Sequence, residues 1–240
     1  MEPKYRMTLE DNIFVAKRNI VDYIWKSAKL EGLTVTYPDT DAIYNGMSVA
    51  NIPVDEIIAV NNLKHAWQFI LENLDYMLDY PYICHLHRIV GGDTLIRDAG
   101  YPRKVPVRIG GTTWKPDMPI ESQIREQLAD IMSIKSPTER AIMLTLYLMR
   151  KQIFLDGNKR VAMLAGNQVM IASGCGIISV PIEHQPAFRN MLIKYYESGD
   201  ANELRSFLYE NCVDGIDFEY EAKDCQSDRE GDGYEKEEEM

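Results

Sequence analysis

Hydrophobic residues recur at intervals of three and four along most of this chain, the spacing that gathers them on one face of an α-helix. The first such stretch ends at Gly32, and glycine is favoured immediately after a helix. A loop is expected over residues 34–51, where the periodicity lapses. The pattern predicts helices over residues 11–31, 55–73, 82–90, 120–132, 137–151, 158–173, 185–198 and 202–212.

Two of these helices have candidate N-caps. Asp55 follows Pro53 at the start of the second helix. Ser136 precedes Pro137, a residue type favoured in the first helical position, and Glu139 lies at the spacing of a capping box. Both helices are therefore expected to begin where these residues stand.

Residues 158–173 are apolar on nearly all sides of the predicted helix, which is typical of a buried helix. The helix is expected to stop at Gly174 and Gly176. The apolar run over residues 177–180 fits either a short strand or extended chain ahead of Pro181.

Residues 100–119 break the helical pattern. Gly110 and Gly111 stand where a hairpin turn would lie, and the preceding hydrophobic residues alternate with other types. We predict a short β-hairpin, restricted to a sheet edge because Pro106 lacks an amide hydrogen. The alternating residues are Val105, Val107 and Ile109.

Composition fits one large domain with an appendage. The chain has 240 residues, of which 45% are hydrophobic, enough to bury a substantial core. The formal net charge is −11, but residues 217–240 alone hold eleven Asp or Glu and three Lys or Arg. Such a segment buries too little apolar surface to offset its ordering entropy. We expect a helical domain over residues 1–215 and a disordered acidic tail over residues 216–240.

Cysteine spacing and hydropathy bear on the compartment. The four cysteines form no CxxC pair, and no charged-then-apolar leader opens the chain. Apolar stretches are interrupted well short of the roughly 20 residues that a membrane-spanning helix needs. These features predict a cytoplasmic protein without a membrane segment.

A glycine, an amide and two cations stand where the buried helix begins, in the sequence Asp156-Gly157-Asn158-Lys159-Arg160. The unpaired amides and positive dipole end of a helix N-terminus accommodate phosphate. The guanidinium can grip two phosphate oxygens, and Asp156 offers the hard oxygen ligand that Mg²⁺ prefers. The same residues taken alone also fit a turn followed by an exposed basic pair.

The wider sequence favours a phosphate site. Residues 152–160, QIFLDGNKR, resemble the signature of the Fic family, in which histidine, phenylalanine, an acidic residue, glycine, asparagine and arginine have fixed spacing. Residues 103–116 are similar to the family's substrate-positioning flap, for which we assign Val107, Ile109, Gly110 and Gly111. The resemblance covers about residues 11–215 and implies an all-α, Fic-type helical bundle with a short β-hairpin flap.

Members of the Fic family typically move AMP from ATP to a Ser, Thr or Tyr hydroxyl of a target protein, and one branch transfers phosphate instead. The resemblance therefore implies a nucleotide, Mg²⁺ and an unidentified target protein as ligands, and it leaves a homodimer open. It assigns Mg²⁺ to Asp156 and makes Phe154 the anchor of the loop. The residues expected to cradle the phosphates are Gly157, Asn158, Lys159 and Arg160.

Two positions depart from the family pattern. Gln152 replaces the histidine that acts as general base, and a neutral amide does not accept a proton near pH 7. A positioned base is typically worth on the order of 10² to 10⁴ in rate, so we expect catalysis to be impaired. Met163 stands where many members carry a second arginine for the terminal phosphate.

Residues 27–32, SAKLEG, match the spacing of the family's inhibitory motif through Ser27, Glu31 and Gly32. In the family, the glutamate pairs with the second arginine and obstructs the terminal phosphate. With Met163 in that position, Glu31 would have to pair with Lys159 or Arg160 instead. An ordinary surface charge at a helix end explains Glu31 equally simply.

The replaced histidine leaves open a non-catalytic nucleotide-binding or protein-binding module. Cys84, His85 and His87 are too few to make a closed zinc site, and packing is the simpler role. His65 and His184 are expected to be ordinary, partly buried side chains, and the alternative is that one of them replaces the missing base in space. The tryptophans lack an accompanying basic stripe, so nucleic-acid binding is not expected.

Overall fold

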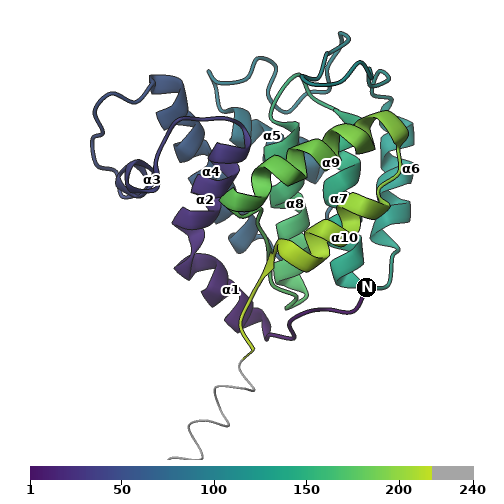
Figure 1. The fold of residues 1–240 in the computed structure, drawn as a ribbon, viewed down its shortest axis with the longest axis horizontal. Helices are drawn as coiled ribbons and strands as arrows, with labels where there is room; N and C mark the ends of the chain where they lie inside the picture. Colours follow the sequence, from purple (N-terminus) through teal and green to yellow (C-terminus); the bar gives the residue numbers. More distant parts are fainter. Residues whose placement is uncertain (218–240) are drawn as a thin grey trace, which may run out of the picture.

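The computed structural model describes residues 1–217, which form an all-α bundle with one very short β-ladder (Figure 1). Among these residues, no helix combines the length and the apolar character needed to cross a membrane. All but the first two residues of the tail predicted over residues 216–240 lie outside the described part. The elements in chain order are α1 Leu9–Arg18, α2 Ile20–Leu30, α3 Tyr37–Tyr44, α4 Val54–Glu72, α5 Tyr80–Gly91, α6 Glu121–Met132, α7 Pro137–Lys151, α8 Asn158–Ala172, β1 Ile177–Ile178, the 3₁₀ turn η1 Ile182–His184, α9 Gln185–Ser198, α10 Asn202–Asn211 and β2 Val213–Asp214.

Helix α8 lies in the middle of the bundle, behind α9 and α10 in Figure 1 and packed against α7, α4 and α5. Its apolar sequence is explained by this position, because all but two of its residues are buried. Gly166 lets α7 approach closely: a Cβ atom there would lie 2.1 Å from Thr145 Oγ1. That hydroxyl donates to Ala141 O at 2.9 Å, so the tight helix pair leaves it hydrogen-bonded.

The run over residues 177–180 forms a strand only at β1, which pairs antiparallel with β2. Two buried asparagines hold this part of the chain. Asn167 donates to Ile178 O at 2.9 Å and accepts from Ile178 N at 2.6 Å. Asn12 makes the same pair of contacts with Gly176. Buried amides thus satisfy backbone groups that so short a ladder leaves unpaired.

Two predictions for the N-terminal region are wrong: the single helix expected there is interrupted, and the loop expected after it contains a helix. Asn19 separates α1 from α2, with φ −108° and ψ 12°, so one predicted helix is two. The loop expected over residues 34–51 contains α3. Thr36 and Asp39 form a capping box at its start, a local signal that the hydrophobic periodicity of so short a helix did not reveal.

Helix starts differ from the prediction in two details. Pro53 is the N-cap of α4, and Asp55 lies in the first turn, where its charge favours the helix dipole. Ser136 caps α7 as expected, accepting from Glu139 N at 3.3 Å. The Glu139 carboxylate does not complete a capping box, because it pairs with Arg205 of α10 at 3.1 Å.

The predicted β-hairpin is absent from the described residues, although a turn does form at Gly110 and Gly111. The flanking chain is extended without ladder hydrogen bonds. Several of its carbonyl groups accept from the buried side chain of Arg103 rather than from an opposite strand. Pro106 and Pro116 also lack the amide hydrogens that a ladder needs. We call residues 103–118 the flap.

Candidate functional site

The loop over residues 152–157 joins the end of α7 to the start of α8 through two left-handed residues. Gln152 closes α7 with φ 50° and ψ 57°, and Gly157 opens α8 with φ 74° and ψ 3°. The positive φ favours glycine at this position, and a Cβ atom there would lie 2.8 Å from Ile96 Cδ1, so the isoleucine side chain would have to shift. The loop is therefore shaped by backbone constraints.

Asn158 holds this loop closed with its side chain. Its Oδ1 accepts from Phe154 N at 3.0 Å, and its Nδ2 donates to Phe154 O at 2.9 Å and to Gln152 Oε1 at 3.2 Å. The Gln152 amide in turn donates to Met149 O at 2.6 Å. The side chain of Asn158 thus fixes the loop while the residue also lines the neighbouring cavity, and its predicted phosphate contact stays a prediction.

His87 of α5 supports the loop from below, and sequence analysis did not assign it to the site. Its ring is 1% exposed and stacks on Phe154, with centroids 3.7 Å apart and planes at 4°. Gly100 N donates to Nδ1 at 2.8 Å, which leaves Nε2 to donate to Asp156 O at 2.9 Å. Burial lowers the pKa of His87 to about 4, so the ring is neutral near pH 7. His87 therefore has a structural role, in agreement with the packing role that the sequence favoured.

The charged residues of the loop meet the end of α2. Glu31 lies 3.1 Å from Lys159 Nζ and 3.9 Å from Arg160 Nε. Arg160 is 7% exposed and its Nη2 is 3.4 Å from Asp156 Oδ2. Within the described chain, Arg160 Nε and Glu31 Oε1 are buried without a hydrogen-bond partner. Arg189 of α9 donates to backbone carbonyls at the end of α2 and so holds the segment that carries Glu31.

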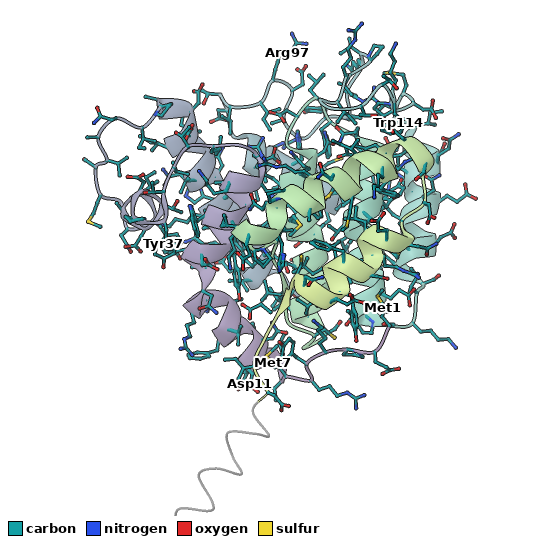
Figure 2. The ribbon with its side chains drawn as sticks, viewed as in Figure 1. Met1, Met7, Asp11, Tyr37, Arg97 and Trp114 are labelled. Atoms are coloured by element: carbon teal, nitrogen blue, oxygen red, sulfur yellow. The ribbon has the colours of Figure 1, made fainter. Side chains whose placement is uncertain are left out.

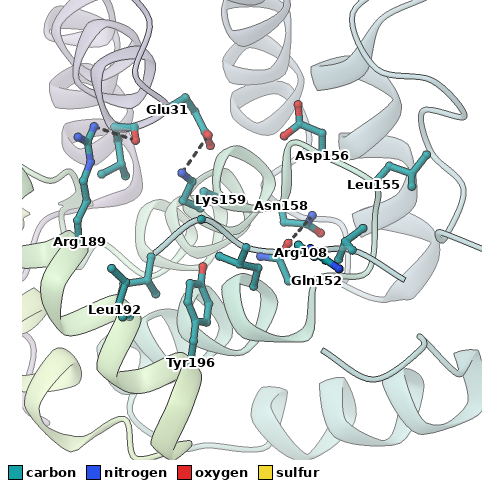
Figure 3. Close-up of a pocket in the computed structure, with 15 residues that line it drawn as sticks. Glu31, Arg108, Gln152, Leu155, Asp156, Asn158, Lys159, Arg189, Leu192 and Tyr196 are labelled. Atoms are coloured by element: carbon teal, nitrogen blue, oxygen red, sulfur yellow. Dashed lines mark hydrogen bonds and ion pairs between the residues drawn. The ribbon is translucent and has the colours of Figure 1, made fainter. Parts of the chain in front are cut away.

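One cavity of about 370 Å³ gathers most of the predicted site residues. We call it the cleft. Figure 3 shows Glu31 and Lys159 joined by a dashed line, with Asp156, Gln152 and Tyr196 among the other lining residues. Its lining from the predicted set is Glu31, Val107, Ile109, Gly110, Gln152, Asp156, Asn158 and Lys159.

Other predicted residues stand outside the lining of the cleft. Gly111, Gly157 and Arg160 adjoin it, and Gly32 ends α2 with φ 86°. Ser27 lines a separate small cavity together with Met163. His65 is exposed and His184 packs on Phe207, so neither replaces the missing base.

Arg103 is a second residue that sequence analysis missed. Its guanidinium is buried, with the residue 3% exposed, and donates to Gln152 O at 2.7 Å and Val105 O at 3.0 Å. It also donates to the carbonyls of Pro116 and Asp117. One side chain therefore ties both ends of the flap to the loop.

Tyr196 of α9 forms part of the opposite wall of the cleft. It is 3% exposed, and its ring stacks on Trp114 of the flap, with centroids 5.7 Å apart and planes at 3°. Burial, followed by the negative charge of Glu31, raises the pKa of the Tyr196 hydroxyl. The phenol is therefore neutral near pH 7 and offers a hydrogen bond rather than a charge.

Comparison with known proteins agrees with this geometry. Residues 77–170 match the sequence profile of the Fic/DOC family, a span that contains the flap and the loop. The chain is 28% identical over 202 residues to protein adenylyltransferase fic-1 of Caenorhabditis briggsae and 27% identical over 203 residues to that of Caenorhabditis elegans. Each alignment covers 78% of this chain and 38% of the relative, so the chain spans well under half the length of these proteins.

Solved structures share the fold of this chain. A fragment of Fic-1 from C. elegans superposes with a TM-score of 0.69 at 24% identity, covering 84% of this chain and 64% of that one. A Fic-domain signalling protein from Bacteroides thetaiotaomicron gives a TM-score of 0.66 at 23% identity, covering 78% and 75%. At these identities the likeness establishes the fold, and the expected all-α Fic fold is confirmed.

Proposed function

We propose that this chain is a Fic-type transferase that binds a nucleoside triphosphate in the cleft and directs AMP, or phosphate, to a Ser, Thr or Tyr hydroxyl of a target protein. The observation that carries the proposal is the cleft itself, where Lys159, Asp156, Gln152 and the flap meet. Its volume of about 370 Å³ lies within the range of small-molecule sites.

The phosphates would lie at the start of α8. The first bond within this helix runs from Val161 N to Gly157 O at 3.0 Å, so the amides of residues 158–160 precede it and are free to face a ligand. The dipole of α8 and the cations Lys159 and Arg160 add positive charge at the same place. Phosphate oxygens that displace Glu31 would also meet the guanidinium of Arg160, whose buried Nε lacks a hydrogen-bond partner in the described chain.

Asp156 fits a Mg²⁺ site shared with those phosphates. Its side chain is 69% exposed and lines the cleft. Mg²⁺ commonly takes one or two carboxylates and completes its shell with water and phosphate oxygens. No cluster of three His, Cys, Asp or Glu occurs among residues 1–217, so the phosphates would supply further ligands. Bound beside Asp156, Mg²⁺ would neutralise phosphate charge.

Gln152 limits the chemistry. The target oxygen would bond to phosphorus as the bond to the leaving group breaks, pyrophosphate when AMP is transferred and the nucleoside diphosphate when phosphate is transferred. The proton of the hydroxyl would pass to water because the amide cannot hold it. The Gln152 side chain is held by Met149 and Asn158, so its place is fixed beside the incoming hydroxyl. Transfer that relies on positioning and charge, without a base, is expected to be slow.

Glu31 would restrain triphosphate binding. Its carboxylate is 15% exposed and forms ion pairs with Lys159 and Arg160, the two cations that the phosphates would need. Lys159 replaces the second arginine of the family as its main partner. The contact supports the proposal that residues 27–32 inhibit the site, with Glu31 as the acting residue.

A second candidate is a binding module without catalysis, and Gln152 favours it. The side-chain amide of Gln152 donates to Met149 O and accepts from Asn158, so its hydrogen bonds are made without a bound substrate. The same cleft would then hold a nucleotide, or a segment of a protein partner, without transferring anything.

Incubation with Mg²⁺ and ATP labelled on the α-phosphate, in the presence of cell lysate, distinguishes the two candidates. The wild type is compared with Gln152→His, which restores a base, and with Gln123→His, the same change on the exposed surface of α6. Labelling that is weak in the wild type, strong in Gln152→His and unchanged in Gln123→His would support the transferase.

Absence of labelling by the wild type at every enzyme concentration, with labelling by Gln152→His, would favour the binding module. Calorimetry on the same proteins measures nucleotide affinity. Failure of the wild type to bind any nucleotide at millimolar concentration would refute both candidates in the forms that use ATP. Labelling on the γ-phosphate alone would identify phosphate as the transferred group.

A further inference from the structure

We propose that a second groove, which shares Leu155 with the cleft, binds an acidic segment of the target protein next to the hydroxyl to be modified. This inference rests on the proposed transferase function, because it assumes that a protein hydroxyl enters the cleft. The groove has a volume of about 240 Å³, and we call it the outer groove. Its lining holds three cations, Arg97, Arg103 and Lys104, and one carboxylate, Asp98, and is completed by Tyr101, Pro102, Val105 and Leu155.

The outer groove and the cleft adjoin each other. Leu155 lines both cavities, and the flap supplies Val105 to the outer groove and Val107 to the cleft. An extended chain advances about 3.3 Å per residue. A target segment that presents its hydroxyl in the cleft would therefore cross Leu155 and enter the outer groove within a few residues.

Positive charge is concentrated beside the outer groove. Residues 97–115 hold five Lys or Arg and one Asp, a net of +4, in a chain whose net charge is −11. Figure 2 shows Arg97 and Trp114 at the end of the molecule away from Met7 and Asp11. This end thus differs in sign from the protein as a whole, and charge complementarity selects an acidic partner.

The individual cations differ in their availability. Lys104 and Arg108 are exposed and form no ion pair with another described residue, while Arg97 lies 3.4 Å from the exposed carboxylate of Asp98. The Arg103 guanidinium is buried, which lowers its pKa, and it already donates hydrogen bonds to backbone carbonyl groups. Lys104 and Arg97 are therefore the cations in the outer groove that an acidic side chain would meet.

Apolar surface accompanies the charge. Tyr101 is 58% exposed and Val105 is 46% exposed, both in the lining of the outer groove. Arg88 lies over the ring of Tyr101, with its guanidinium carbon 5.6 Å from the centroid. A peptide that alternates acidic and apolar side chains would satisfy both kinds of surface. A nucleic acid would supply the charge but no aliphatic side chains for Val105 and Leu155.

Peptide binding tests the inference directly. Three fluorescein-labelled peptides share one serine and the same leucines and differ in carrying glutamate, glutamine or lysine at the remaining positions. Fluorescence anisotropy is measured with wild type, with Arg97→Glu/Lys104→Glu, and with Lys17→Glu/Lys135→Glu. The control pair changes the net charge equally, on exposed residues at the end of α1 and before α7.

Lys135 lies just before the start of α7, and the loop of the site follows the other end of this helix. Because α7 has 15 residues and rises 1.5 Å per residue, Lys135 is about 20 Å from the site. We expect the glutamate peptide to bind wild type most tightly and to weaken at high salt. Reversing two exposed charges should weaken that peptide about tenfold and strengthen the lysine peptide. The control pair should change either affinity less than threefold.

Equal binding of the three peptides, or equal loss in both charge-reversed proteins, would overturn the inference. Binding of a single-stranded oligonucleotide of the same charge as tightly as the glutamate peptide would identify the groove as a general polyanion site and also overturn it. ATP calorimetry on the same preparations separates this outcome from failure of the transferase proposal. Retained ATP binding without peptide discrimination refutes the outer groove alone.

Discussion

The carboxylate of Glu31, at the end of α2, lies 3.1 Å from the ammonium group of Lys159, in the first turn of α8. The two residues are far apart in sequence and meet inside the cleft (Figure 3). A phosphate group at the start of α8 requires the same cation. The carboxylate therefore competes with the ligand for Lys159 and repels it as well.

Removing this carboxylate should strengthen triphosphate binding. We expect Glu31→Gln and Glu31→Gly to raise the affinity for ATP by about 1 to 3 kcal/mol, with little change for ADP or AMP. The glutamine variant is the sharper test, because it removes the charge without altering the backbone at the end of α2. Calorimetry with the three nucleotides measures the effect. A gain of equal size for all three would indicate loosening of the fold, and unchanged ATP affinity would remove autoinhibition from the account.

Asp156→Ala and Arg160→Ala should weaken nucleotide binding in the presence of Mg²⁺. Each variant loses a charge-assisted contact worth about 1.5 to 3 kcal/mol, roughly tenfold or more in affinity. Asp130→Ala, on the exposed surface of α6, is the matched control for Asp156. Arg160 is buried, so thermal unfolding must accompany calorimetry for that variant. Relative to wild type, Asp156→Ala should bind nucleotide more weakly in the presence of Mg²⁺ and almost equally well in its absence. If the substitution weakened nucleotide binding equally with and without Mg²⁺, the metal assignment would be contradicted.

The local parts of the site could be predicted because their signals are local in sequence. A glycine followed by a buried apolar helix marks a helix start in the sequence, and Gly157 does open α8, in the left-handed conformation. Helical periodicity placed Glu31 at the end of an amphipathic helix. The cleft then brings Glu31 to Lys159, one of the two partners proposed from the absence of the second arginine at Met163.

The features that the sequence did not predict depend on contacts between segments that are distant along the chain. His87 reaches the loop across 69 residues and Arg103 reaches it across 49. No spacing along the chain marks either residue as a partner of Gln152 or Asp156. The flap was predicted as a hairpin because alternation and the Gly110-Gly111 pair were the local signals, whereas three carbonyl groups of the flap accept from one arginine side chain, that of Arg103.

Replacing Arg103 should destabilise the fold and free the flap. Arg103→Met leaves several carbonyl groups without their donor, at a cost of about 2 to 4 kcal/mol in the free energy of unfolding. Arg103→Lys should lose less, because an ammonium group replaces some of the donors. Arg125→Met, on the exposed face of α6, should change stability by less than about 0.5 kcal/mol.

Urea unfolding measures these changes, and limited trypsin digestion reports on the flap. Cleavage after Lys104 and Arg108 should become faster in Arg103→Met than in Arg125→Met. Equal stability and equal cleavage rates in these two variants would show that Arg103 does not hold the flap.

His87 makes stability depend on pH in a direction that its contacts fix. Protonation would place a hydrogen on Nδ1, which faces the amide hydrogen of Gly100. Burial lowers the pKa of His87 to about 4 in the folded protein, against 6.5 when the chain is unfolded. Above pH 6.5 both states hold a neutral ring, and the full stability is present. As pH falls from 6.5 to 4, only the unfolded state gains the proton, so stability is lost.

At about 1.4 kcal/mol per pH unit, this histidine should remove about 2 kcal/mol between pH 7.5 and pH 5. Urea unfolding at the two pH values measures the loss, and comparison of variants isolates its source. In His87→Gln the loss should shrink by that amount, because an amide does not titrate. His65→Gln, at an exposed position of α4, should retain the loss of the wild type. If His87→Gln kept the whole pH dependence, the ring of His87 would already be accepting its proton in the folded state, and its neutral contact with Asp156 O would no longer explain how the loop is held.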